Sequence, residues 1–122
     1  MNTSEIRALL ARLDGEPADA IESQTVEFMS WDSKPEARDR LNRELRERVV
    51  AQANAAGGVL ILGVADRKRT RRDAIQGVGD LDANYVRKQV YDGTVPHILV
   101  DIEELTEPEG RLLVPVSYTH LT

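Results

Sequence analysis

The chain lacks two features that would each place it in a distinct class of protein. It has no cysteine, which excludes disulfides and thiolate metal sites and is typical of a reducing compartment. No run approaches the roughly 20 apolar residues that a membrane-spanning helix needs, and the start of the chain has no apolar core of signal-peptide length. We therefore expect a soluble, cytoplasmic protein with no membrane partner.

Aromatic residues are also scarce, at 4% of the sequence. The core must therefore consist mainly of Leu, Val, Ile and Ala. The apolar content of 41% in 122 residues is enough for one domain with a single core. Trp31, Tyr85 and Tyr91 are the only plausible platforms for stacking of nucleobases, and we expect each of them to belong to the core instead.

Charge is distributed unevenly along the chain. The formal net charge is −5, which argues at first against nucleic acid as a partner. The segment from Lys34 to Arg72, however, carries 11 Lys and Arg against 5 Asp and Glu. Such asymmetry indicates one basic face on an otherwise acidic body. For the arginines between Arg38 and Arg48 alone, the solvated face of an ordinary helix is an equally natural explanation.

Apolar periodicity and turn residues predict helices interleaved with strands. A first helix, with Thr3 or Ser4 as its cap, precedes a strand at 25–29. A long helix follows Pro35, with Ser33 and Glu36 spaced as a capping box. The remaining expected elements are a buried strand at 59–64, a short returning strand at 74–78, a helix at 81–91, and a hairpin of strands at 97–105 and 111–116.

Gly57-Gly58 stands between the long helix and the buried strand. Glycine adopts the left-handed conformation without steric cost, so the pair is expected to end the helix. Phosphate-binding loops have the opposite order, because they follow a strand and open a helix. No Gly-Lys-Ser/Thr motif occurs either, and we expect this chain to bind no nucleotide.

Several short patterns occur in order along the chain. They are Glu22, Glu27-Phe28, the run from Ala51 to Gly58 (AQANAAGG), Gly63-Val64-Ala65-Asp66 and Gly77-Val78. Together they resemble the AlbA-like domain of Schlafen proteins and of many bacterial regulators, over about residues 20 to 116. The chain departs from the family pattern at Met29, where a lysine is usual. The resemblance implies an α+β fold: a single domain whose mixed β-sheet is packed by two or three helices.

The resemblance also implies nucleic-acid binding and, in some Schlafen members, metal-dependent cleavage of structured RNA. Carried over by position, the catalytic and metal-binding carboxylates would be Glu22, Glu27 and Asp66. Phosphodiester hydrolysis of this kind needs Mg²⁺ or Mn²⁺ held by oxygen ligands. The alternative is that Glu22 and Glu27 are ordinary surface acids and Asp66 serves only to start a turn, because acidic residues are common in this chain. No other cofactor is expected.

The segment Arg67-Lys68-Arg69-Thr70-Arg71-Arg72, hereafter the basic segment, directly follows Asp66. Five like charges in six residues cannot be buried together, so we expect an exposed loop. Guanidinium groups suit bidentate contacts with phosphate. The predicted nucleic-acid-binding residues are those of the basic segment, Arg67, Lys68, Arg69, Arg71 and Arg72, together with Arg43 on the long helix.

The end of the chain, Val116-Ser117-Tyr118-Thr119-His120-Leu121-Thr122, resembles the translation of a transposase adapter used in sequencing libraries. We therefore expect residues 117–122 to be a non-native tail on a truncated gene fragment. The predicted organisation is an N-terminal helix at 1–19, the AlbA-like domain at 20–116, and this tail.

Three functions remain open on the sequence alone. The first is a DNA- or RNA-binding domain of a bacterial transcriptional regulator. The second is a metal-dependent endoribonuclease that uses the three carboxylates. The third is a protein-interaction or dimerisation domain, a homodimer for example, in which an edge strand near Val114 pairs with another chain.

Overall fold

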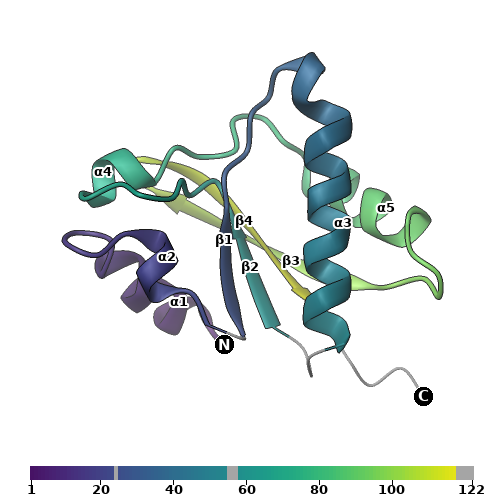
Figure 1. Ribbon diagram of the computed structural model, residues 1–122, viewed down its shortest axis with the longest axis horizontal. Coiled ribbons are helices and arrows are strands. Elements are labelled where there is room, and N and C mark those ends of the chain that lie inside the picture. Colours follow the sequence, from purple (N-terminus) through teal and green to yellow (C-terminus); the bar gives the residue numbers. More distant parts are fainter. Residues whose placement is uncertain (24, 55–57, 118–122) are drawn as a thin grey trace.

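A four-stranded mixed sheet forms the centre of the protein, as a computed structural model shows (Figure 1). The structure describes residues 1–23, 25–54 and 58–117. The strands are β1 (Val26–Met29), β2 (Gly58–Leu62), β3 (Val100–Glu107) and β4 (Gly110–Ser117), in the spatial order β1-β2-β4-β3. β1 and β2 are parallel, whereas β4 is antiparallel to both of its neighbours.

Helices cover both faces of this sheet. α1 (Thr3–Ala11) and α2 (Ala18–Ile21) lie on one side of it, and α3 (Arg38–Asn54) and α5 (Ala83–Asp92) lie on the other (Figure 1). A 3₁₀ turn (Pro35–Ala37) leads into α3, and the short α4 (Arg71–Ala74) follows β2. None of the helices that the structure describes is long and apolar enough to cross a membrane. The α+β fold, with one mixed sheet packed by helices, is confirmed.

Alternation along the strands divides the core into two layers. Val59 and Ile61 of β2 face α1 and α2, whereas Leu60 and Leu62 face α3 and α5. All four are buried, and burying a side chain of this size contributes about 1.5–3 kcal/mol. The first layer also contains Ile6, Leu10 and Leu13 of the N-terminal region, so the predicted N-terminal helix shares the core of the domain.

Three predictions of local structure are wrong. Asn2 caps α1 in place of Thr3 or Ser4, because its side chain accepts from the Glu5 N–H while Glu5 accepts from the Asn2 N–H. Lys34 precedes the 3₁₀ turn without a side-chain cap, so the capping box at Ser33 does not form.

The third error is the predicted returning strand at 74–78. α4 occupies residues 71–74, because the Thr70 hydroxyl accepts from the Asp73 N–H and caps a helical turn, so Ala74 ends a helix and does not begin a strand. Only Ile75 makes a bridge to Val64.

The glycine pair is described only at its second residue, since Gly57 lies outside the described residues. Gly58 is the first residue of β2 and does not have a positive φ. A Cβ added to Gly58 would lie 3.2 Å from the Thr25 carbonyl oxygen and 3.2 Å from Gln52 Cδ. Gly58 therefore allows β1 and α3 to approach the start of β2 closely.

The predicted tail at 117–122 is described only at Ser117, which ends β4 opposite Gly58 and Val100.

Candidate functional site

The three predicted carboxylates line one open hollow of about 430 Å³. Glu22 follows α2, Glu27 lies in β1, and Asp66 follows the turn at the end of β2. Ser23 and Arg48 complete the lining. This carboxylate hollow is thus assembled from α2, β1, α3 and the exit of β2.

The pKa of Glu22 is shifted by burial and by the other charged groups of the carboxylate hollow. Partial burial raises the pKa of Glu22, and the negative charges of Asp66 and Glu27 raise it further. The Phe28 N–H, which donates to Glu22 Oε2 at 3.0 Å, and the positive charge of Arg48 act in the opposite direction. The net shift is upward, so the repulsion and burial in this hollow are only partly compensated.

Arg48 is a site residue that the sequence reasoning missed. Its Nη1 donates to Glu27 Oε2 at 3.0 Å and to the Phe28 carbonyl oxygen at 3.3 Å, while its Nε and Nη2 both donate to Glu44 Oε1. A signal for it exists in the sequence. Glu44, Arg48 and Gln52 recur every four residues beside the apolar stripe of α3, and a flanking position of this kind faces the sheet edge.

Glu22 and Arg48 also cover the free edge of β1. The Thr25 carbonyl accepts from Val59 of β2, and the Met29 carbonyl accepts from Gly63 just after β2, so Val26 and Phe28 direct their backbone groups outward. The Ser23 N–H donates to the Val26 carbonyl, Glu22 accepts from Phe28, and Arg48 donates to the Phe28 carbonyl. These contacts occupy backbone groups that an added strand would need.

The residues do not fit a divalent metal in this arrangement. Within residues 1–23, 25–54 and 58–117, no group of three or more Asp, Glu or His side chains is placed so that it could hold a metal ion. Glu27 is instead paired with the guanidinium of Arg48. This arrangement gives no support to catalytic or metal-binding roles for Glu22, Glu27 and Asp66, which stay predictions from the family resemblance. We derive no reaction step through a metal.

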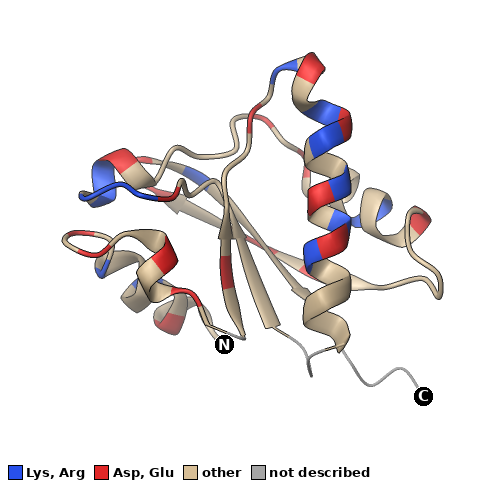
Figure 2. Cartoon of the chain, in the orientation of Figure 1, with Lys and Arg blue, Asp and Glu red and all other residues tan. Residues whose placement is uncertain are grey.

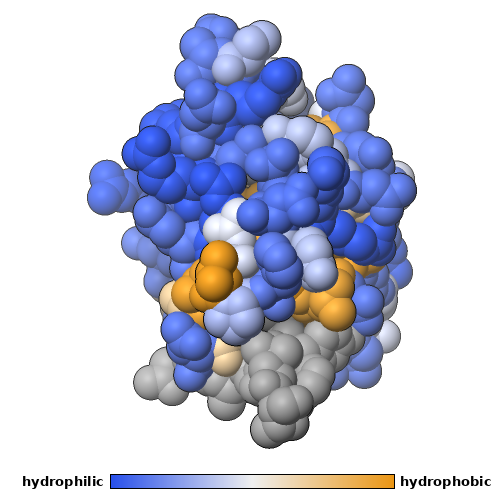
Figure 3. Space-filling view, turned by 90° about the vertical axis from the view of Figure 1, so that its right-hand side faces the viewer, coloured by the Kyte–Doolittle hydropathy of each residue, from blue (hydrophilic) through white to orange (hydrophobic). Residues whose placement is uncertain are grey.

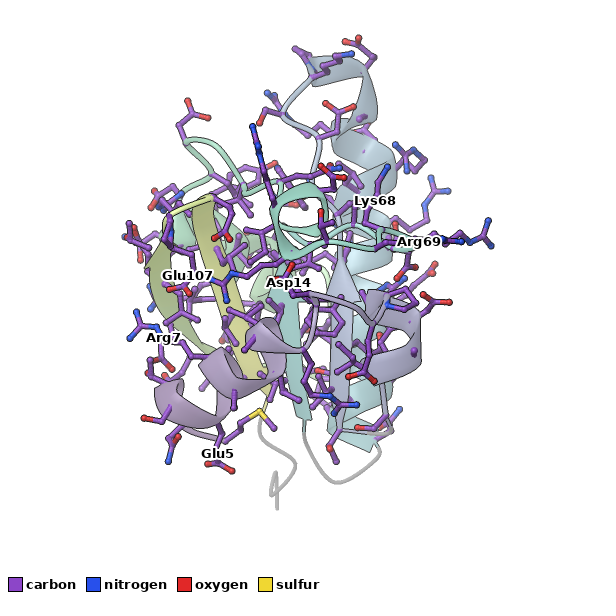
Figure 4. The ribbon with its side chains drawn as sticks, turned by 90° about the vertical axis from the view of Figure 1, so that its left-hand side faces the viewer. Glu5, Arg7, Asp14, Lys68, Arg69 and Glu107 are labelled. Carbon is purple, nitrogen blue, oxygen red and sulfur yellow. The ribbon has the colours of Figure 1, made fainter. Side chains whose placement is uncertain are left out.

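The basic segment divides into an exposed part and a paired part. Arg67, Lys68 and Arg69 are exposed and form no ion pair with any described residue, as expected for a loop (Figure 2). Backbone contacts hold this loop in place, since the Gly15 N–H donates to the Arg69 carbonyl at 3.0 Å. Figure 4 shows Lys68 and Arg69 well away from Arg7 and Glu107.

Arg71 does not belong to the exposed part. It donates to Glu107 Oε1 at 2.8 Å and to Glu109 Oε2 at 2.7 Å, and its side chain is only 20% exposed. The expectation that all five charges are exposed is wrong at this residue, because the β3–β4 hairpin brings two carboxylates to it. The guanidinium of Arg71 is thus engaged within the fold. Arg72, on α4, is exposed and has no ion pair among the described residues.

Arg43 is exposed on α3 and likewise has no ion pair within the described part of the chain. Asp39 and Glu47 lie one turn before and after it, so acidic and basic side chains alternate along this helix (Figure 2). The side of the molecule that carries α3 and α5 is mostly hydrophilic (Figure 3). α3 therefore presents a solvated face of mixed charge, with a weaker positive field than the basic segment.

Comparisons with known proteins agree with this fold. The chain is similar to the DIP2311 protein from Corynebacterium diphtheriae, with a TM-score of 0.61 and 20% sequence identity. The similarity covers 97% of this chain and 26% of that protein, so the chain spans about a quarter of the other protein's length. No curated protein sequence matches the chain. The sequence model of the family described as Schlafen, AlbA_2 matches residues 22–117. The chain therefore belongs to the Schlafen AlbA_2 family, and this membership indicates a nucleic-acid-related domain.

Proposed function

We propose that the chain is a nucleic-acid-binding domain of a bacterial transcriptional regulator, which contacts the phosphate backbone of DNA or RNA. The observation that carries this proposal is the state of Arg67, Lys68 and Arg69. They are adjacent, exposed and without an ion pair among the described residues. Arg72 adds a further exposed cation next to them.

Backbone contact is the mode of binding that these residues favour. Guanidinium and ammonium groups in an exposed loop neutralise phosphates without reading base identity. The net charge of −5 repels nucleic acid elsewhere on the protein, so binding depends on this local region. Such binding weakens steeply with salt, because each neutralised phosphate releases condensed counterions. The exposed arginine of α3, Arg43, is expected to add little, since acidic neighbours offset its charge.

A matched pair of double variants tests the proposal. Lys68→Ala/Arg69→Ala removes two charges from the basic segment, and Arg87→Ala/Lys88→Ala removes two from the exposed side of α5. Binding to a labelled duplex DNA and to tRNA is measured by electrophoretic shift over a range of salt concentrations. We expect the first variant to lower the slope of log affinity against log salt by about 1.4–1.8, and the second to leave it unchanged. Equal effects of the two variants, or no binding by the unaltered protein at low salt, would refute the proposal.

Two alternative functions follow from the sequence, RNA cleavage and dimerisation. Metal-dependent RNA cleavage stays a prediction, tested by incubating tRNA and Mn²⁺ with the protein and with Glu27→Gln. Dimerisation stays a prediction, but the edge strand expected near Val114 is wrong, because Val114 is buried in β4, between β2 and β3. The edges of the sheet are β1 and β3.

A further inference from the structure

A second hollow lies near the first residues of α3 and α5, and it shares no lining residue with the carboxylate hollow or with the exposed part of the basic segment. It has a volume of about 270 Å³, close to the lower limit of about 300 Å³ for small-molecule sites. Trp31, Leu81 and Tyr85 supply its apolar lining. We call it the aromatic hollow. The scarcity of aromatic residues makes this convergence informative, since two of the five in the chain line one small hollow.

The two aromatic rings are half-buried, and neither stacks on another ring among the described residues. Trp31 and Leu81 pack against the core layer beneath α3 and α5 and also line the hollow. Tyr85 is held by its hydroxyl, which accepts from Asn42 Nδ2 at 2.8 Å, and Asn42 is itself only 6% exposed. Trp31 thus packs against the core, as expected, and both rings also line the hollow.

The backbone around the aromatic hollow is also held in place. Asp32 Oδ1 accepts from the Lys34 N–H at 2.9 Å and fixes the turn that follows Trp31. On the opposite side Gly79, with φ +63°, approaches this turn so closely that a Cβ would lie 3.1 Å from Ser33 Oγ. Arg111 Nη1 donates to the Gly79 carbonyl at 3.0 Å. The walls thus come from two turns that are fixed before any ligand binds, which reduces the entropy cost of binding.

Charged groups of both signs line the same hollow. Lys34 and Arg38 offer cations that suit a phosphate, and Asp32 and Asp80 offer carboxylates. A carboxylate accepts hydrogen bonds from the exocyclic amino group of a base. Aromatic walls, cations and acceptors together match a nucleobase that carries a phosphate.

We propose that the aromatic hollow binds one amino-bearing nucleobase and its attached phosphate, by stacking on Trp31 or Tyr85 with the phosphate at Lys34 and Arg38. The base comes from a single strand or from a free mononucleotide, which share this chemistry. The expectation that the chain binds no nucleotide rested on the absence of a phosphate-binding loop, and this hollow does not use one. This inference rests on the proposed function only for the single-stranded source. Its site is separate from Lys68 and Arg69, so the two can be tested apart.

Trp31 provides a direct probe, because it is the only tryptophan in the chain. Stacking of a base on or beside its ring quenches its fluorescence. The full chain is titrated with an adenine oligonucleotide, with an abasic oligonucleotide of the same length and charge, and with adenosine monophosphate. N-acetyltryptophanamide, titrated in parallel, corrects for absorption by the bases. We expect saturable quenching by the adenine oligonucleotide or by the mononucleotide, and none by the abasic strand.

A variant pair separates stacking from loss of structure. Tyr85→Leu is expected to weaken the quenching titration roughly 5- to 150-fold, the range that corresponds to one lost base-stacking contact. Tyr91→Leu removes an exposed ring that stacks on His97 outside the hollow, and is expected to have no effect. Circular dichroism tests whether both variants fold. If Tyr85→Leu does not fold, Lys34→Ala/Arg38→Ala replaces it and is likewise expected to weaken the titration.

The outcomes distinguish this inference from the proposed function. Quenching by the mononucleotide alone supports the hollow and assigns it to a free ligand. Equal quenching by adenine and abasic strands, or an unchanged titration of folded Tyr85→Leu, overturns the inference. Strand binding without any quenching also overturns the inference and leaves the proposed function intact. Quenching by the mononucleotide without any strand binding supports the inference and refutes the proposed function.

Discussion

Arg48 offers the sharpest test of how the carboxylate hollow is held together. In Arg48→Met the long stem is kept, so packing of the apolar part and helix propensity change little. The variant loses the ion pair with Glu27, two hydrogen bonds to Glu44 and one to the Phe28 carbonyl. If these groups were fully buried, removing one partner would cost about 3–5 kcal/mol.

Solvent access argues for a smaller effect. The side chains of Arg48, Glu27 and Glu44 are 31%, 29% and 36% exposed, so water can solvate both acids once the guanidinium is gone. Partly exposed ion pairs contribute up to about 1 kcal/mol each. The charge-assisted hydrogen bond to the Phe28 carbonyl would contribute about 1.5–3 kcal/mol where water is excluded, and is discounted here because the Arg48 side chain is 31% exposed. We therefore expect a loss of about 1–2 kcal/mol in the free energy of unfolding.

Urea denaturation at neutral pH measures this loss, with Arg43→Met on the same helix as the control. Arg43 has no ion pair among the described residues, and its variant should change stability by less than about 0.5 kcal/mol. A loss above about 3 kcal/mol in Arg48→Met would show that the carboxylates are effectively cut off from water. A result equal to that of Arg43→Met would show that the ion pairs contribute no net stability. Either result would refute the reasoning.

Three further predictions concern stability. Gly63→Ala should cost more than about 2 kcal/mol in urea denaturation, because φ is +110° and the new Cβ would lie 2.7 Å from Leu112 Cδ2. Glu22→Gln should be more stable than the unaltered protein above the ordinary glutamate pKa of about 4.3. The raised pKa of Glu22 means that its ionisation costs stability as pH rises, and glutamine cannot ionise. Thermal melts should show this gain at neutral pH and its disappearance in acid. Arg71→Met should cost more than Arg48→Met, since Glu107 is only 7% exposed. Arg71 lowers the pKa of Glu109, so stability that is present above about pH 4.3 is lost as pH falls, and the Arg71→Met variant should lose less of it.

The predictions that succeeded rest on local periodicity. The continuous apolar run of β2 and the four-residue apolar stripe of α3 identify their elements, because a strand covered on both faces is apolar throughout and a helix packed on one face is apolar at every third or fourth residue. α5 forms within the helix predicted at 81–91, and the side chain of Asp82 caps it by accepting from the Asn84 N–H. The hairpin of β3 and β4 follows from the turn at Glu107-Pro108-Glu109-Gly110.

The predictions that failed depend on contacts between distant segments. The pairing of Arg71 requires the β3–β4 hairpin to lie beside α4, which no local pattern reveals. Placement of β4 in the interior of the sheet is likewise a property of topology, and it rules out the edge strand expected near Val114. Convergence of Trp31 with Tyr85 needs α3 and α5 to pack side by side. Sequence periodicity determines which face of an element is buried, but not which element it meets.

The contacts around Met29 explain how the fold accommodates methionine at a position where the family pattern has lysine. The resemblance leads one to expect a lysine there, beside the carboxylates. Met29 is instead buried in the core layer beneath α3, where an unpaired ammonium group would be costly. The positive charge in the carboxylate hollow comes from α3, through Arg48 and its ion pair with Glu27. A cation is thus retained beside the acids, but it enters from the helix and occupies Glu27. This arrangement explains why the three predicted carboxylates can share one hollow without being placed to hold a metal.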